Sequence, residues 1–387
     1  MNSKLKRVFA GIVAAATVFA CASVLGSCGD KDSEGVLKIG AIGPITGTAA
    51  TYGTAVKNGA ELAIKEINAA GGVNGMKLEL DYQDDANTTN LALEAYNTIK
   101  DNGAKLLIGT VTSTPCQAVA VEAEKDNMFL LTPSGSAVEC IKPKNAFRIC
   151  FSDPDQGAAS AKYISEKKLA QKVAVIYDST TVYSTGLLSS FKSITDVNFE
   201  IVSEQTFTDG DTDFSTQVQA VKASGADLVF LPIYYEAASM ILKEANAQGL
   251  DVKFFGCDGL DGVIGQLGKD SDMAEGVMLL TPFAADSADE KSQKFTAAYK
   301  AAYNDEVPNQ FAADAYDAVY TVKAALEKAD VKDASISASQ LCDKLVEAMP
   351  QITVDGVTGK MTWNAAGEPT KDAKAMYIEG GSYKALN

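Results

Sequence analysis

The chain has 387 residues, of which 47% are hydrophobic and 22% charged, and it contains no histidine. Single hydrophobic cores stop growing at roughly 250–300 residues, so a chain of this length is expected to form two lobes. The lack of histidine excludes Ser-His-Asp and Cys-His catalysis and histidine-containing zinc sites, and the excess of 50 acidic over 34 basic side chains argues against nucleic acid as a partner.

Residues 1–28 have the pattern of a secretory signal peptide. A basic start precedes an uncharged apolar run at 8–25, and small residues then lead to Cys28, in a string that resembles the bacterial lipobox. We expect lipid attachment at Cys28; Cys21 lies behind a bulky phenylalanine and is the poorer candidate. The charged segment 29–35 is a linker, which disfavours the alternative of an uncleaved membrane anchor. The mature chain carries 31 basic and 50 acidic side chains, a formal charge of −19.

Strand and helix patterns alternate through the first part of the mature chain. Short apolar runs bounded by turn residues predict strands, and apolar residues at helical spacing predict helices between them. The predicted strands are 36–42, 77–82, 105–109 and 128–132, and the predicted helices are 56–67, 89–101 and 115–126. This βαβα order predicts a parallel sheet covered by helices on both faces.

The same alternation then restarts, which predicts a second α/β unit of similar length. Its strands are 172–177, 199–206, 227–232 and 253–257, and its helices are 155–168, 184–194, 213–223 and 235–247. After about residue 283 the pattern becomes helical and ends in two strand-like pieces. The last predicted helices are 288–303, 310–328 and 338–348, and the strand-like pieces are 359–363 and 374–379.

Five cysteines follow the signal peptide, and none has C-x-x-C spacing. A structural zinc site or a thioredoxin-like redox site is therefore not expected, and we expect neither a metal ion nor a cofactor. Export permits disulfides, and we expect a bridge between Cys116 and Cys140. An odd number of cysteines leaves at least one thiol free.

Polar residues follow several of the predicted strands, where parallel sheets bind ligands. In the first unit, Ser113 follows one strand, and Ser134 and Ser136 follow the next. Hydroxyls and free backbone N–H groups at helix starts suit an anion such as a carboxylate. In the second unit, Asp258 follows a strand and suits a cation such as an ammonium group.

Two tyrosines, Tyr183 and Tyr234, also follow strands of the second unit and offer flat walls with one polar tip each. An α-amino acid presents a carboxylate beside an ammonium group, so it matches a cleft with hydroxyls on one side and an acid on the other. Each residue alone is more often a helix cap, a turn residue or part of the packing. Their joint placement at strand ends in both units favours a binding cleft.

Several strings in order along residues 36–380 carry a family resemblance. They are Ile39–Gly47 with Tyr52-Gly53, Ile67–Gly75, Gln83-Asp84-Asp85, Thr132-Pro133, Asp155-Gln156-Gly157, Asp213-Phe214-Ser215 and Gly359–Trp363. In these strings the chain resembles the branched-chain amino-acid-binding proteins, which are the Leu/Ile/Val receptors of the type I periplasmic binding protein class.

The resemblance implies a Venus flytrap, with two doubly wound, parallel-sheet α/β lobes joined by a three-segment hinge. One lobe would comprise 36–153 and 283–365, and the other 154–282 and 366–387. It also implies a solute-binding lipoprotein of an ABC importer that delivers an amino acid, of branched-chain type, to the membrane permease. We expect a monomer, lipid-anchored on the outer face of the cell membrane, and no enzymatic activity.

The resemblance assigns the head-group contacts residue by residue. The carboxylate would be held by Ser113 and the backbone N–H of Ser136. The ammonium would be held by the carbonyl of Ser134, the hydroxyl of Ser136 and the acid of Asp258. Aromatic residues would line or close the cleft, namely Tyr52, Tyr183, Tyr234 and Phe311.

The chain departs from the family pattern at three points, and the first two leave the side-chain class of the solute open. The position of Asp258 commonly carries the longer Glu, that of Ser136 often carries Thr, and the cysteines that pair in some relatives are replaced by Asn87 and Thr112. An amide, a urea-like solute or an aromatic acid is therefore an alternative to a branched-chain amino acid. A ligand sensor with the same fold is a further alternative.

Overall fold

The structure, a computed structural model, describes residues 35–371 and 373–386. The predicted signal peptide, the lipidation site at Cys28 and most of the linker 29–35 lie outside the described residues. Among the described helices, none has the length and the apolar character needed to cross a bilayer.

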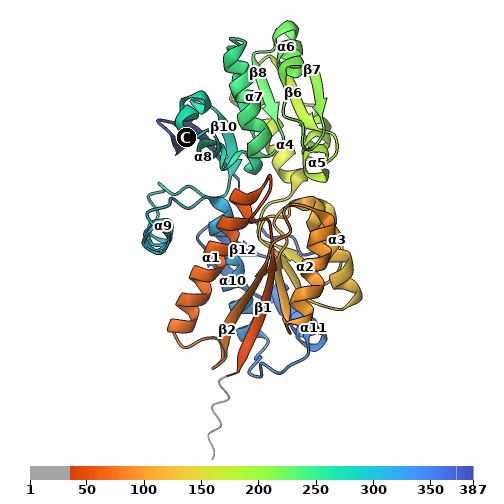
Figure 1. Ribbon diagram of the computed structural model, residues 1–387, viewed down its shortest axis with the longest axis vertical. Coiled ribbons are helices and arrows are strands. Elements are labelled where there is room, and N and C mark those ends of the chain that lie inside the picture. Colours follow the sequence, from red (N-terminus) through yellow and green to blue (C-terminus); the bar gives the residue numbers. More distant parts are fainter. Residues whose placement is uncertain (1–34, 372, 387) are drawn as a thin grey trace, which may run out of the picture. The chain divides into compact units, whose positions relative to one another are not determined.

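Within the described residues, five parallel strands form the first sheet, in the order β2-β1-β3-β4-β5. The elements of this part of the chain are β1 (Val36–Ile42), α1 (Ala50–Ala69), β2 (Lys77–Gln83), α2 (Thr89–Asp101), β3 (Leu106–Gly109), α3 (Ser113–Lys125), β4 (Leu130–Thr132), a 3₁₀ turn (Val138–Ile141) and β5 (Ala146–Arg148). Successive side chains of β3 enter different cores, because a strand alternates its side chains between the two faces of a sheet. Leu106 and Ile108 pack in the core that contains α1, whereas Leu107 packs with α2 and α3. Figure 1 shows α1 on one side of β1 and α2 and α3 on the other.

The second sheet has seven strands in the described chain, in the order β14-β13-β10-β9-β8-β6-β7. The elements that lead to it are α4 (Asp153–Glu166), β6 (Lys172–Asp178), α5 (Val182–Ser193), β7 (Glu200–Phe207), α6 (Ser215–Ser224), β8 (Leu228–Leu231), α7 (Tyr235–Ala247), β9 (Lys253–Gly256), a 3₁₀ turn (Asp258–Leu260), α8 (Val263–Leu267), a 3₁₀ segment (Gly268–Ala274) and β10 (Met278–Thr281). Every residue of the central strand β8 is buried, as expected for a parallel strand covered on both faces. The last two strands, β13 (Lys374–Glu379) and β14 (Ser382–Ala385), pair in antiparallel fashion. The sequence predicted a purely parallel sheet, and this sheet is mixed.

Three helices and a small hairpin separate β10 from β13. They are α9 (Glu290–Ala302), α10 (Gln310–Lys328), α11 (Ala338–Ala348), a 3₁₀ turn (Met349–Gln351), β11 (Thr353–Gly356) and β12 (Gly359–Thr362). Helix α10 packs along α1 in the first lobe. The two helices approach so closely that a Cβ atom at Gly59 would overlap the carbonyl oxygen of Ala312. Glycine is therefore required at position 59 by the close approach of α10.

The described chain passes between the two sheets three times, after β5, after β10 and after β12. These passages agree with the expected two-lobed fold, whereas the precise lobe boundaries stay a prediction. A buried ion pair joins two of the passages to α10. The Lys371 ammonium lies 2.6 Å from Asp314 and donates to the Ile149 carbonyl at 3.0 Å and to Thr358 at 2.8 Å.

Long periodic helices lie where the sequence predicted them, and α2, α7, α10 and α11 have the predicted bounds. Four short strands were not predicted, namely β5, β10, β11 and β14. The predicted disulfide is wrong, because Cys116 and Cys140 are both free thiols in the described chain. Both are buried in the core of α2 and α3, and the Cys140 thiol donates to the Ser113 carbonyl at 3.6 Å.

Lys371→Met should destabilise the protein by about 3 kcal/mol, because it leaves the Asp314 carboxylate buried without its cation. Urea unfolding at pH 7.5 measures the change. Lys384→Met is the matched control, because Lys384 pairs with Asp286 at 3.2 Å on the surface. The control should lose about 0.5 kcal/mol or less, and equal losses in the two variants would contradict a structural role for the buried pair.

Candidate functional site

A small, narrow pocket lies where the carboxyl ends of strands from both sheets meet. Its walls come from the first turns of α1, α5 and α10, from the N-cap of α7, and from the segments after β3, β4 and β9. The lining residues are Tyr52, Val111, Thr112, Ser134, Ser136, Tyr183, Tyr234, Asp258, Gly259 and Phe311. Seven of the eight residues predicted to bind the ligand are therefore brought together, and Ser113 is the exception.

Aromatic rings form most of the apolar wall. Tyr52 stacks on Phe311 with 4.1 Å between the ring centroids, and Tyr183 stacks on Tyr234 at 4.7 Å. Tyr52 also meets Tyr234 edge to face at 5.6 Å, so the two stacked pairs are in contact. Such arrangements are the preferred ones for aromatic pairs, and they fix the ring positions.

The Tyr52 hydroxyl connects the two lobes. It donates to the Gly259 carbonyl at 2.5 Å and accepts a hydrogen bond from the Tyr235 amide at 3.2 Å. Next to it, the Thr51 amide donates to the Tyr235 hydroxyl at 3.3 Å. Burial raises the pKa of Tyr52 well above its usual value, so the hydroxyl keeps its proton and remains a donor. These bonds hold the two sides of the cleft together.

Asp258 is a buried carboxylate on the floor of the cleft. The Tyr183 hydroxyl donates to its Oδ1 at 2.6 Å, and its backbone N–H donates to Gln156 at 3.1 Å. Burial raises the pKa of Asp258 to about 6, although the hydrogen bonds with Tyr183 and Gln156 oppose the rise. The ionised form of Asp258 is therefore less stable here than in water, and a cation bound beside it would stabilise that form.

The serine segments of the first lobe are bound to each other. The Ser134 hydroxyl donates to the Val111 carbonyl at 2.7 Å, and the Ser113 hydroxyl accepts a hydrogen bond from the Ala137 amide at 3.2 Å. This second bond directs the Ser113 hydroxyl to the neighbouring loop, which accounts for its absence from the pocket wall. A ligand contact for Ser113 stays a prediction.

Asp153, the first residue of α4, is a candidate that the sequence did not reveal. Its side chain is 1% exposed, and no hydrogen bond from the described residues reaches either carboxylate oxygen. Burial raises its pKa well above the usual value, and the nearby Ser136 hydroxyl offsets only part of the rise. Its amide donates to the Ser136 carbonyl at 3.0 Å, so it borders the loop that lines the pocket. In the sequence it resembles any acid before Pro154 at a helix start.

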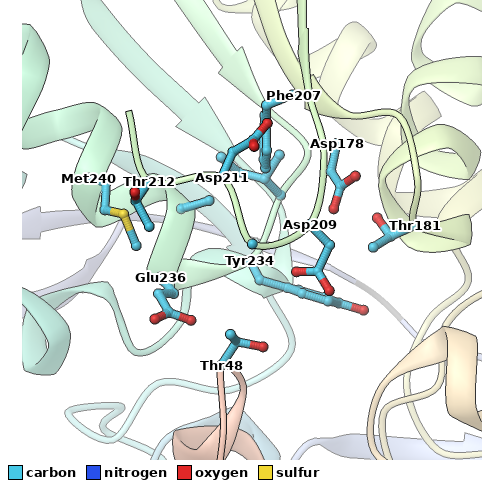
Figure 2. Close-up of a pocket in the computed structure, with 13 residues that line it drawn as sticks. Thr48, Asp178, Thr181, Phe207, Asp209, Asp211, Thr212, Tyr234, Glu236 and Met240 are labelled. Atoms are coloured by element: carbon cyan, nitrogen blue, oxygen red, sulfur yellow. The ribbon is translucent and has the colours of Figure 1, made fainter. Parts of the chain in front are cut away.

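A second, acidic pocket shares Tyr234 with the first (Figure 2). Carboxylates and hydroxyls face it, from Thr48, Asp178, Thr181, Asp209, Asp211, Thr212 and Glu236. Burial raises the pKa of Asp209, and the charge of Asp178 adds to the rise. Across the described residues, no group of three or more acids or cysteines is placed to hold a metal ion.

A family model of periplasmic binding proteins matches residues 36–382. The chain belongs to this family. Within it, the chain falls with the branched-chain amino-acid-binding proteins of the type I fold. The Leu-, Ile-, Val-, Thr- and Ala-binding protein of Pseudomonas aeruginosa is 29% identical over 355 residues, which cover 91% of this chain and 92% of that protein.

Solved structures of periplasmic binding proteins have the same fold. The branched-chain amino acid transporter substrate-binding protein LivJ of Streptococcus pneumoniae, in complex with isoleucine, is 31% identical, has a TM-score of 0.82 and covers 90% of this chain and 98% of its own. A solute-binding protein of an ABC transporter from R. palustris, in complex with benzoate, is 23% identical, with a TM-score of 0.81 over 91% and 96% of the chains. The family and the fold class expected from the sequence are thus confirmed, and the relatives are substrate-binding transport proteins.

The ligand-free protein should become more stable on mild acidification, in part through Asp258. The pKa of this group is about 6 in the folded chain against an ordinary 3.8. The folded state therefore binds the proton more readily, and stability rises as the pH falls from about 6 towards 4. Between pH 7.5 and pH 5 this group contributes a gain on the order of 1 kcal/mol. Urea unfolding at both pH values should show that gain missing in Asp258→Asn; an identical pH dependence in the two proteins would rule out the raised pKa.

Proposed function

We propose that this chain is the solute-binding lipoprotein of an ABC importer and that it captures a free amino acid, of branched-chain type, in the pocket between its lobes. The observation that carries the proposal is the buried Asp258 carboxylate, which faces a pocket otherwise lined by aromatic rings, hydroxyls and backbone groups. The isoleucine complex of the S. pneumoniae relative supports the same class of solute.

The ammonium of the solute would lie against Asp258. It would also contact the Ser134 carbonyl and the Ser136 hydroxyl, and the buried Asp153 carboxylate borders the same loop. A cation at this point would stabilise a carboxylate whose ionisation burial opposes. The carboxylate of the solute would lie at the Ser136 N–H, with Ser113 next to it.

The side chain of the solute would pack among the rings of Tyr52, Tyr183, Tyr234 and Phe311. Rings in fixed positions offer apolar surface without a large loss of conformational entropy, which suits a compact aliphatic group. An aromatic acid such as the benzoate bound by the R. palustris protein is the alternative solute. It lacks an ammonium group, so it would leave Asp258 buried without a cation.

Binding would favour the closed cleft. A solute that contacts Asp258 in one lobe and Ser136 in the other binds the closed form better than an open one, so it shifts the population towards closure. The bonds of Tyr52 to Gly259 and Tyr235 would form in the same closed form. The protein then presents a loaded, closed surface to the permease and performs no chemical step.

A thermal-shift screen of the twenty amino acids, common amides and benzoate tests the solute class. A specific ligand at a hundredfold excess over its Kd should stabilise the folded chain by about 2.7 kcal/mol. We expect leucine, isoleucine or valine to give the largest shift. A shift with benzoate or with a neutral amide, and with no amino acid, would refute the amino-acid assignment.

Asp258→Asn should weaken binding of the selected amino acid by about 3 kcal/mol, because the ammonium would lose its charged partner. Isothermal titration calorimetry measures the loss. Asp261→Asn is the matched control, since Asp261 is also buried, has its pKa raised by burial to about 6, and does not line the pocket. Affinity that falls equally in both variants would move the ammonium site away from Asp258.

Cys28→Ser should release the protein from the membrane fraction of cells, because it removes the thiol that would carry the lipid. Cys21→Ser is the matched control and should leave the protein in the membrane fraction. Cell fractionation followed by immunoblotting distinguishes the two variants. Release by Cys21→Ser alone would place the anchor at the other cysteine.

A further inference from the structure

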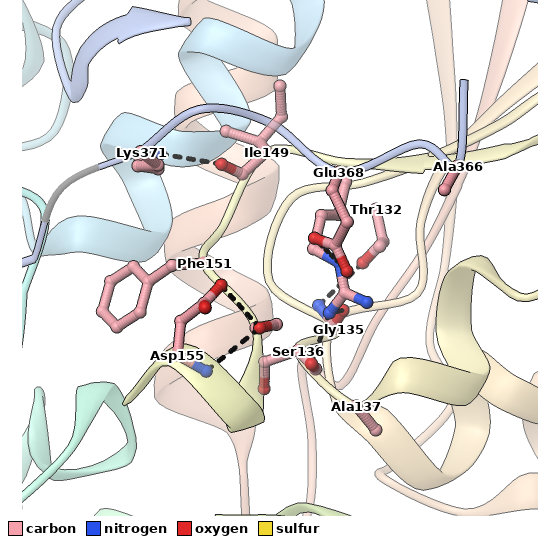
Figure 3. Close-up of polar contacts among 12 residues, drawn as sticks. Thr132, Gly135, Ser136, Ala137, Ile149, Phe151, Asp155, Ala366, Glu368 and Lys371 are labelled. Carbon is pink, nitrogen blue, oxygen red and sulfur yellow. Dashed lines mark hydrogen bonds and ion pairs between the residues drawn. The ribbon is translucent and has the colours of Figure 1, made fainter. Parts of the chain in front are cut away.

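Arg148, the last residue of β5, is a fully buried cation in the first lobe. It lies beside the segment after β4 that contains Ser134 and Ser136, which we call the serine loop. Its Nη1 donates to the Ser136 carbonyl and, at 3.4 Å, to the Gly135 carbonyl. Its Nε lies 3.1 Å from the carboxylate of Glu368, which belongs to the third passage between the sheets (Figure 3). One guanidinium nitrogen, Nη1, therefore serves two consecutive peptide carbonyls, Nε faces an acid, and Nη2 has no hydrogen-bond partner within the described residues.

The two carbonyls fix how these peptide groups are oriented. In a trans peptide the N–H points opposite to the C=O, so the Ser136 N–H points away from Arg148. The next amide, that of Ala137, donates to the Ser113 hydroxyl at 3.2 Å. The Ser136 N–H itself makes no hydrogen bond within the described residues, so it remains an available donor beside the pocket that Ser136 lines.

The pocket provides no other positive charge. Its lining residues include one acid, Asp258, and no lysine or arginine. An anionic group bound there would contact only the dipoles of hydroxyl and peptide groups. A cation could still stabilise it from the far side of those peptide groups. Arg148 has that position, because one peptide group separates its guanidinium from the Ser136 N–H. A buried charge acts strongly over such a distance, since little water screens it.

We propose that Arg148 is a positioning residue of the anion subsite, and that it acts through the Gly135–Ser136 peptide. It aims the Ser136 N–H at the carboxylate of the solute, and its charge behind the peptide favours an anion over a neutral group. The inference rests on the proposed function, because it concerns the head group of the same solute. Glu368 offsets part of the charge and so sets how strongly the subsite prefers an anion.

If Arg148 had only a structural role, its contacts would hold β5 against the serine loop and the third passage and would not affect the choice of solute. The two roles differ in what they do to head-group selectivity. L-leucine and L-leucinol share the side chain and the ammonium group, and leucinol has a neutral hydroxymethyl group in place of the carboxylate. The ratio of their affinities therefore reports on the anion subsite, whereas a general loss of structure lowers both affinities together.

The experiment measures both affinities by isothermal titration calorimetry, with displacement of leucine where leucinol binds weakly. If another amino acid gives the largest thermal shift, that acid and its amino alcohol are used. Arg148→Met should reduce the preference for the carboxylate about tenfold, as expected for the loss of a charge-assisted interaction. Arg148→Lys keeps the charge and should retain part of the preference. Glu368→Gln should increase it.

Lys371→Met is the matched control, since it removes the other buried cation of these passages without touching the serine loop. It should leave the ratio unchanged even if both affinities fall. An unchanged ratio in Arg148→Met would overturn the inference and leave the proposed function intact. If that variant does not fold, an unchanged ratio in Glu368→Gln has the same meaning. Wild-type protein that binds no amino acid would overturn the proposed function itself.

Discussion

Parallel strands impose the position of the binding pocket. A chain that builds such a sheet must leave each strand at the same edge and return through a helix, so the polar residues after the strands collect at that edge. In this protein the edges of two sheets meet, and the segments after β3, β4 and β9 contribute to one pocket. The Tyr52 hydroxyl then closes the space by bonding to Gly259 across the cleft. The chemistry of the site follows from which side chains stand at these few positions.

Buried charges around the cleft are compensated in three different ways. Lys371 is matched by the Asp314 carboxylate and by two further oxygens, so the pair is complete within the protein. Arg148 is matched by one acid and by peptide carbonyls, which leaves part of its charge to act on the loop. Asp258 receives hydrogen bonds but no cation, and burial raises its pKa. Arg148 and Asp258, both incompletely matched, lie beside and at the pocket, where the two ends of the proposed zwitterionic solute would complete them.

In the proposed site, the head group and the side chain of the solute would be recognised by different parts of the fold. Charged and polar contacts come from strand ends, whose positions are set by the sheets. The walls come from rings at the first turns of α1, α5 and α10 and at the N-cap of α7. This division agrees with relatives of one fold that hold isoleucine in one case and benzoate in another.

Local patterns in the sequence determined much of the architecture. The long helices and buried parallel strands have strong periodicity, and two α/β units follow from their order. The strands β5 and β14 were not predicted because segments of three or four residues are too short to show a hydrophobic periodicity. They are strands only because they pair with β4 and β13. The Cys116–Cys140 bridge was also wrong: spacing along the chain does not determine whether two cysteines are bonded, and in the described chain both are buried free thiols.

The residue types after the strands, together with the family resemblance, were enough to name seven residues of the pocket. Their meeting in one pocket was decided only by the tertiary structure, because it requires two sheets to face each other. The same holds for Arg148 and Asp153, which look like an ordinary strand end and an ordinary helix start in the sequence. Their significance comes from burial and from the direction of their hydrogen bonds, which depend on segments that are distant in the chain.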